Sequence, residues 1–139
     1  ALRVRQQMQN AETLAAALEK DPRIKKVLHP SLASHPQHEL VKKMYQDGCV
    51  TAMMSIEVEP DREKINAFMR KLNVVNYAMT LGGLRTTIAH PCTSSHYGLP
   101  QEFLDDIGIT YGLIRVSVGL ENVEDLITDF KQALDVFES

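Results

Sequence analysis

The stretch GLIRVSVG, at Gly112–Gly119, has the alternating pattern of a β-strand with a charged residue in its middle. Side chains point alternately to the two faces of a strand, so the composition of each face follows from every second residue. One face carries the branched aliphatic residues Ile114, Val116 and Val118. The other face carries Leu113, Arg115 and Ser117. We expect the aliphatic face to be buried, and the function of the protein to depend on what meets the arginine.

Arg115 is the candidate binding residue of this strand. A guanidinium is costly in the middle of a strand unless an anion meets it, and its planar fork suits a carboxylate or a phosphate. The residues alone leave two interpretations open. Arg115 either binds an anionic ligand or forms a structural salt bridge with an acid elsewhere in the fold.

Three further strands and several amphipathic helices are predicted around this stretch. The strand candidates are residues 24–28, Cys49–Val58 and Val74–Leu81. The helix candidates are Leu2–Lys20, a segment from about Pro36 to Tyr45, residues 65–72, Gln101–Asp106, and a last helix with Asn122 as its N-cap. The expected buried positions are Val4, Met8, Ala11, Ala15 and Leu18 in the first helix, and Leu40, Val41 and Met44 in the second.

The predicted strands have buried residues on one side only, which favours one sheet with helices over a single face. We therefore expect an α+β fold, a two-layer α/β sandwich whose mostly antiparallel sheet has about four strands. The length of 139 residues suits a single domain with one core. The second face of the sheet is then partly polar, and its expected members are Thr51, Ser55, Arg115 and Ser117.

Composition argues against several classes of partner. A net charge of −3 lacks the basic excess with which proteins neutralise nucleic-acid phosphates. No apolar run approaches the roughly 20 residues of a membrane helix, and the N-terminus has no apolar signal core. We therefore expect a protein that binds neither nucleic acid nor membrane. Cys49 and Cys92 stand apart in the sequence, so we expect reduced thiols and a cytoplasmic location.

The histidines are weak candidates for a metal site. Two pairs have short spacings, His35 with His38 and His90 with His96. Metal sites need defined ligand sets with supporting carboxylates or thiolates, and neither pair has them nearby in sequence. We expect no metal.

The loop after His90 and the glycine pair before it are weak candidates for catalysis. Cys92, Ser94, Ser95 and His96 are close in sequence, but closeness does not supply the geometry of a nucleophile and its base. Gly82-Gly83 lacks the further glycines of a phosphate-binding loop. We expect an ordinary polar loop and a turn.

Three longer segments together resemble one enzyme family. They are HPSLASHPQHELVKKM at His29–Met44, MTLGGLRTTIAHPCTSSH at Met79–His96 and YGLIRVSVGLENVEDLI at Tyr111–Ile127. On these segments the chain is similar to the pyridoxal phosphate (PLP)-dependent enzymes of cysteine and methionine metabolism. That family comprises cystathionine synthases and lyases, methionine γ-lyase and O-acylhomoserine sulfhydrylases.

The resemblance implies that residues 1–139 are the C-terminal domain of a longer enzyme of fold type I. It implies a trans-sulfuration lyase or transferase that performs β- or γ-elimination, or γ-replacement, on sulfur amino acids or an O-acylhomoserine. In the family an N-terminal domain holds PLP, and no lysine here stands in the family's Ser-x-Thr-Lys context. We therefore expect this chain alone to bind no cofactor and to be inactive. The parent is expected to be a cytoplasmic homotetramer, and the partners of this domain are its own N-terminal PLP domain and the substrate.

The resemblance also implies roles for three residues. Arg115 matches the family arginine that binds the α-carboxylate of the amino-acid substrate, and Thr80 stands where the family usually has a serine beside that carboxylate. Arg85 replaces an acid found in many members, so it either favours an ester or acidic side chain over the distal ammonium of cystathionine or simply faces solvent. One alternative stays open, a free-standing amino-acid-binding or regulatory module without catalysis.

Overall fold

The computed structural model describes residues 2–44, 51–78, 83–93 and 97–138. Within those ranges five strands form one sheet in the order β1-β2-β5-β4-β3. The strands are β1 (Lys26–Leu28), β2 (Met53–Glu57), β3 (Asn76–Tyr77), β4 (Thr87–Ala89) and β5 (Leu113–Ser117). The helices are α1 (Leu2–Glu19), α2 (His38–Met44), α3 (Arg62–Lys71), α4 (Gln101–Asp106) and α5 (Val123–Ala133), with short 3₁₀ segments η1 (Pro91–Thr93) and η2 (Leu134–Phe137).

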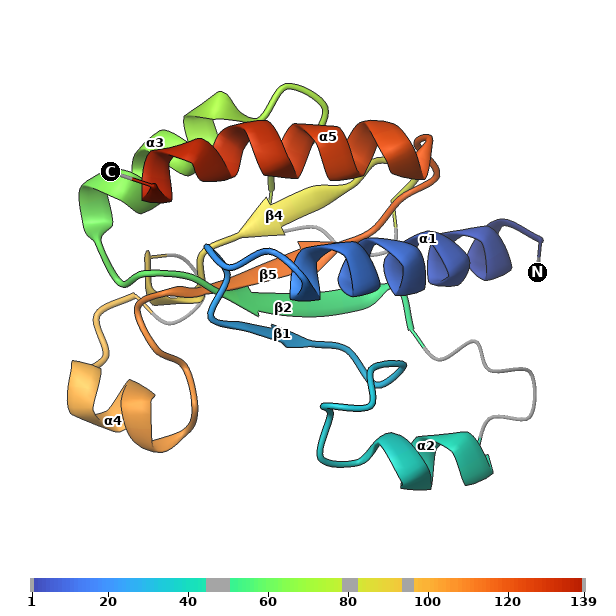
Figure 1. Cartoon of the computed structure of the whole chain (residues 1–139). Coiled ribbons are helices and arrows are strands. Elements are labelled where there is room, and N and C mark those ends of the chain that lie inside the picture. The colour runs from blue at the N-terminus through green and yellow to red at the C-terminus, as the bar shows by residue number, and fades with distance from the viewer. Residues whose placement is uncertain (1, 45–50, 79–82, 94–96, 139) are drawn as a thin grey trace.

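Helices α1, α3 and α5 form a layer over the sheet, and α2 and α4 lie apart from that layer, at the lower side of the view in Figure 1. The expected two-layer sandwich and its α+β class are confirmed. The sheet itself differs from the expectation in having five strands and in being mixed, because one of its four pairings is parallel. β1, β2, β5 and β4 pair antiparallel in turn, whereas β3 pairs with β4 in parallel.

The additional strand is β4, which the sequence pattern does not predict. It has only three residues, Thr87–Ala89, and so is too short to display an alternation of its own. β4 exists because β5 pairs with it, with Ile88 opposite Val116 and Ala89 opposite Arg115. The consequence is that β5 lies in the centre of the sheet, with neighbours on both edges.

The helices over the core follow the predicted periodicity. Asp61 caps α3 by accepting a hydrogen bond from the Lys64 backbone N–H, and Asn122 caps α5 as expected by accepting one from Glu124. Phe68 of α3 and Phe130 of α5 are fully buried, with ring centroids 6.2 Å apart. Burial of these aromatic rings against the aliphatic face of the sheet contributes a large share of the core.

The predicted buried stripe of α1 is right in part, and that of α2 is wrong. In α1 the side chains of Ala11, Ala15 and Leu18 are buried as predicted, whereas Val4 is 46% exposed and the buried positions nearer the start of the helix are Gln7 and Asn10. In α2 none of the residues is buried, and Leu40 and Met44 are 53% and 65% exposed. These differences arise from where the helices lie in the fold. The start of α1 lies against polar loops, and α2 lies away from the core, so helical spacing alone does not decide which side chains are buried there.

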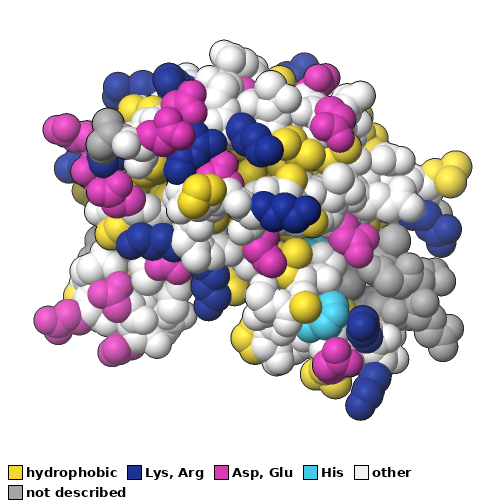
Figure 2. All heavy atoms as spheres, viewed as in Figure 1, with side chains coloured by type: hydrophobic (Ala, Val, Ile, Leu, Met, Phe, Trp, Pro, Cys, Tyr) yellow, Lys and Arg dark blue, Asp and Glu magenta, His cyan; other side chains and the backbone are white. Residues whose placement is uncertain are grey.

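The surface seen in Figure 2 mixes acidic and basic side chains, without a region of one sign across that face. Of the helices described, none combines the length and the apolar character that a membrane span requires.

Candidate functional site

β5 separates an aliphatic face from a polar one, as predicted. Ile114, Val116 and Val118 are fully buried under the helices. On the opposite face Arg115 is half-buried, and Ser117 is buried as well, at 3% exposure. The arginine therefore lies in the middle of the central strand, on the face that the three-helix layer leaves uncovered.

The surroundings of Arg115 form a small open hollow of about 210 Å³. Its lining residues are Leu28, Met53, Met54, Ser55 and Arg115. Ser55 lies directly opposite Arg115 in the pairing of β2 with β5, and Ala89 lies opposite it on β4. A guanidinium flanked by one hydroxyl and by apolar side chains is suited to a small molecule that carries a carboxylate and an aliphatic part.

The other two expected site residues are placed differently. Thr80 lies outside the described residues. Arg85 is exposed, and its neighbour Leu84 accepts a hydrogen bond of 2.8 Å from the backbone of Leu120, five residues beyond Arg115 along the chain. The two arginines therefore come from different ends of the β4–β5 pair.

Two polar residues of α1 are buried although the sequence pattern does not predict it. They are Gln7 and Asn10, which donate hydrogen bonds to the loops at Gly83 and at Gly119. Both are almost fully buried in α1, at 3% and 4% exposure. A signal was available, because positions 7, 10, 11, 14, 15 and 18 follow helical spacing and all six are buried. The apolar residues Val4 and Met8 also fit a helical stripe, and the sequence pattern therefore favours them over the two amides.

The histidines are part of the framework. His29 and His90 each follow a strand and precede a proline, and both are 1% exposed. The Nε2–H of His29 donates to the Thr51 carbonyl, and that of His90 donates to the Tyr111 carbonyl. Burial lowers the pKa of both imidazoles because it disfavours the charged form.

A metal site is not formed in the described part of the chain. No group of three histidine, cysteine or carboxylate side chains comes together there. His38 donates from Nδ1 to the Pro30 carbonyl, whereas His35 accepts at Nδ1 from the backbone of Gln37. His96, the partner of His90 in the other pair, lies outside the described residues.

Cys92 lacks the setting of a reactive thiol. Its side chain is buried, and burial raises the pKa of the thiol, so the nucleophilic thiolate is disfavoured. It forms no disulfide within the described residues. The other members of that candidate group, Ser94, Ser95 and His96, lie outside the described residues, as do Cys49 and Gly82. Gly83 is exposed, and its carbonyl accepts a hydrogen bond from Gln7.

The lysines of this chain do not fit the role of a PLP-binding lysine, which needs an enclosed pocket. Seven of the eight lysines are exposed, and the remaining one, Lys64, pairs with Glu59 at 3.1 Å. Lys25 borders an open hollow of about 440 Å³, but Glu57 and Asp105 line the same hollow and would repel the cofactor's phosphate. None of the eight lysines therefore has the enclosed surroundings that a PLP-binding lysine needs.

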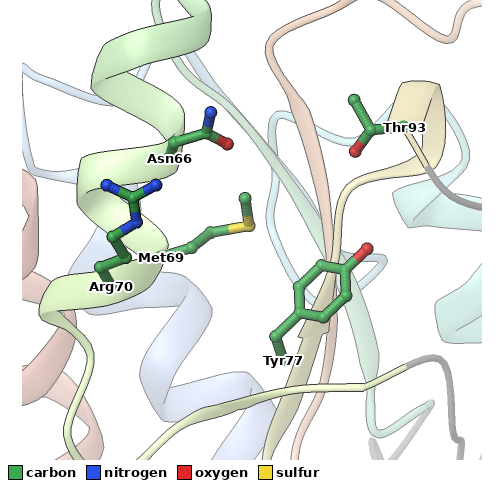
Figure 3. Close-up of a pocket in the computed structure, with 5 residues that line it drawn as sticks. All are labelled: Asn66, Met69, Arg70, Tyr77 and Thr93. Carbon is green, nitrogen blue, oxygen red and sulfur yellow. The ribbon is translucent and has the colours of Figure 1, made fainter.

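A further hollow of about 390 Å³ lies at the other edge of the sheet (Figure 3). Asn66, Met69 and Arg70 of α3 line one side, and Tyr77 of β3 and Thr93 of η1 line the other. The three-helix layer contributes one wall of this hollow, so it is separate from the uncovered face on which Arg115 lies.

The chain is similar to known enzymes over almost its full length. Residues 1–135 match the family described as Cys/Met metabolism PLP-dependent enzyme. The chain is 40% identical over 135 residues to a cystathionine beta-lyase of Lactococcus lactis, covering 97% of this chain and 35% of that protein. It is 38% identical over 134 residues to an L-methionine gamma-lyase of Fusobacterium nucleatum, covering 96% of this chain and 33% of that protein.

The chain is also similar to solved structures over almost its full length. A putative O-acetylhomoserine (thiol)-lyase of Campylobacter jejuni superposes with a TM-score of 0.91 at 38% identity, covering 97% of this chain and 32% of that one. A cystathionine gamma synthase of Xanthomonas oryzae superposes with a TM-score of 0.89 at 34% identity, covering 99% of this chain and 35% of that one. The chain thus spans about one third of the length of the relatives it matches. It belongs to the family of PLP-dependent enzymes of cysteine and methionine metabolism.

Proposed function

We propose that this chain is the C-terminal domain of a PLP-dependent trans-sulfuration enzyme, and that it supplies the binding site for the α-carboxylate of the substrate. The reaction is β- or γ-elimination, or γ-replacement, on a sulfur amino acid or an O-acylhomoserine. The single observation that carries the site is Arg115, a half-buried arginine at the centre of the sheet within an open hollow on the uncovered face.

In this proposal Arg115 binds the substrate by a bidentate contact. Two parallel N–H groups of the guanidinium donate to the two carboxylate oxygens, which fixes both the position and the orientation of the amino acid. Flanking strands β2 and β4 hold the backbone of Arg115 on both sides, so little reorganisation is needed when substrate binds. PLP is held by another part of the parent enzyme, in keeping with the exposed lysines of this chain.

The remaining expectations are part of the same proposal. Thr80 places a hydroxyl beside the carboxylate, and the exposed Arg85 biases the enzyme toward substrates without a distal ammonium. The parent enzyme is a cytoplasmic homotetramer, and this chain alone is inactive because it holds no cofactor.

The test is Arg115→Ala in the full-length enzyme. Loss of a charge-assisted bidentate contact should raise KM for the amino-acid substrate by about ten- to a hundredfold. The visible absorbance of the bound cofactor should stay as in the wild type, because the cofactor site is elsewhere. Arg62→Ala is the matched control, since Arg62 is an exposed arginine at the start of α3. An unchanged KM in the Arg115 variant would remove this residue from the site.

The second candidate is a free-standing amino-acid-binding or regulatory module. The same hollow beside Arg115 favours it, because binding a carboxylate needs no catalysis. Calorimetric titration of the 139-residue chain with methionine, cystathionine and O-acetylhomoserine separates the two. Tight binding by this chain alone would favour the module, whereas binding only in a longer protein that carries PLP favours the enzyme.

A further inference from the structure

Two buried amides of α1 bind the segment that precedes β4 and the segment that follows β5. Gln7 donates from Nε2 to the Gly83 carbonyl at 2.7 Å. Asn10 donates from Nδ2 to the carbonyls of Gly119 and Glu121, at 3.1 and 3.0 Å. Burying an amide is costly unless its hydrogen bonds are made, so these contacts define where the start of α1 lies.

The two segments reached by α1 are also bonded to each other. The Glu121 carboxylate accepts from both the backbone N–H and the hydroxyl of Thr86, each at 2.8 Å. The Gly119 N–H in turn donates to the Thr86 hydroxyl oxygen at 2.9 Å. Thr86 is fully buried, which makes this a closed network with little access for water.

Close packing accompanies the hydrogen bonds. A Cβ atom at Gly119 would lie 2.3 Å from the Leu84 carbonyl oxygen, so only glycine allows the two backbones to approach this closely. The Leu120 N–H donates to the same carbonyl at 2.8 Å. Residues 83–86 and 119–121 therefore behave as one unit.

This unit is continuous with β5, the strand that carries Arg115. Gly119 is four residues after Arg115 and directly follows Val118, the last aliphatic residue of the alternating stretch. A shift of the unit would move the end of β5, and with it the backbone that carries the Arg115 guanidinium. Bidentate recognition is sensitive to shifts below about 1 Å.

We propose that Gln7 and Asn10 are positioning residues for the substrate carboxylate, acting through Gly83 and Gly119. The inference rests on the proposed function of Arg115. α1 does not contact the substrate in this role. Its amides hold residues 83–86 and 119–121, and so the end of the strand that carries Arg115, in one position.

The test compares two inhibitors of the full-length enzyme that differ only in the carboxylate. L-norleucine has an α-carboxylate and no leaving group, and L-norleucinamide replaces that carboxylate with a neutral amide. Gln7→Met and Asn10→Leu remove the donors with little change in volume. Both variants should raise the inhibition constant of norleucine by about tenfold and that of norleucinamide by less than about twofold.

Gln132→Met is the matched control, because Gln132 of α5 also donates from Nε2 to a backbone carbonyl, that of Lys71 at the end of α3. It should leave the ratio of the two inhibition constants unchanged. Should Asn10→Leu or Gln7→Met fail to fold, Gln7→Asn shortens the donor while keeping the side chain polar and provides the same comparison. Equal changes for both inhibitors, or no change for either, would overturn the positioning role.

Arg115→Ala measured in the same assay separates this inference from the proposed function. If that variant does not selectively weaken norleucine, the carboxylate site itself is wrong. If it does so while the Gln7 and Asn10 variants match the wild type, the site stands and only the positioning role fails.

Discussion

The two faces of β5 differ in what surrounds them, although they belong to the same five residues. Ile114 and Val116 are fully buried beneath α1, α3 and α5, whereas Leu113 and Arg115 are half-buried on the uncovered side. The first face carries only aliphatic side chains, so it contributes to the stability of the fold and has no polar group for binding a ligand. The second offers a cation, a hydroxyl and some apolar area, which is a composition for binding.

From this difference we expect that stability and the proposed carboxylate binding can be changed separately within one strand. Area removed from water on the helix side contributes to folding in proportion to its size. The half-buried guanidinium on the other side is the group of this strand that suits an anion. Substitutions that alternate along β5 should therefore alternate in their consequences.

The largest expected effect is on the helix side. Ile114→Ala leaves a cavity in a fully buried site and should lower the free energy of unfolding by about 2–5 kcal/mol. Denaturant unfolding of the 139-residue chain measures it. Leu113→Ala, one residue away on the other face, is the control and should cost clearly less. Similar losses in the free energy of unfolding for the two variants would contradict the expected difference between the two faces.

A smaller effect on stability is expected from pH. It comes from two buried histidines outside β5, since neither face of that strand carries a histidine. Burial lowers the pKa of His29 and His90 in the folded state, so the unfolded chain binds protons that the native chain does not. Stability should be complete above the unfolded value of about 6.5 and fall as pH drops below it, by up to about 1.4 kcal/mol per pH unit for each histidine.

The measurement for this prediction is the free energy of unfolding between about pH 5 and pH 8. The double variant His29→Gln, His90→Gln should flatten the dependence, because glutamine keeps a donor and does not titrate there. A profile as steep as that of the wild type would assign the dependence to other groups.

The smallest effect is expected at Arg85, which is exposed. Arg85→Glu in the full-length enzyme should raise the ratio of cystathionine to O-acylhomoserine turnover by about two- to fivefold, the range of exposed charge interactions. Steady-state kinetics with both substrates give the ratio, and raised salt should reduce the difference. No shift in the ratio would mean that Arg85 has no part in specificity.

Long elements with a strong period could be predicted from the sequence. The stripes of α3 and α5, the cap at Asn122 and the alternation of β5 all depend on neighbours within a few residues. β4 could not be predicted, because its three residues become a strand only by pairing with β5 and β3. The hydrogen-bond partners of Gln7 and Asn10 could not be predicted either, since they lie 76 to 111 residues away, although helical spacing alone indicates that both positions are buried.

The sequence by itself determined that Arg115 stands opposite an aliphatic face, and through resemblance it identified the family. Alternation is a local property of the strand, which is why it could be read without a structure. Only the tertiary structure decided that β5 is the central strand, that Ser55 and Ala89 flank Arg115, and that α1 binds the loops at its end. Those arrangements depend on pairing and packing between segments far apart in the chain, where no short sequence pattern specifies the partner.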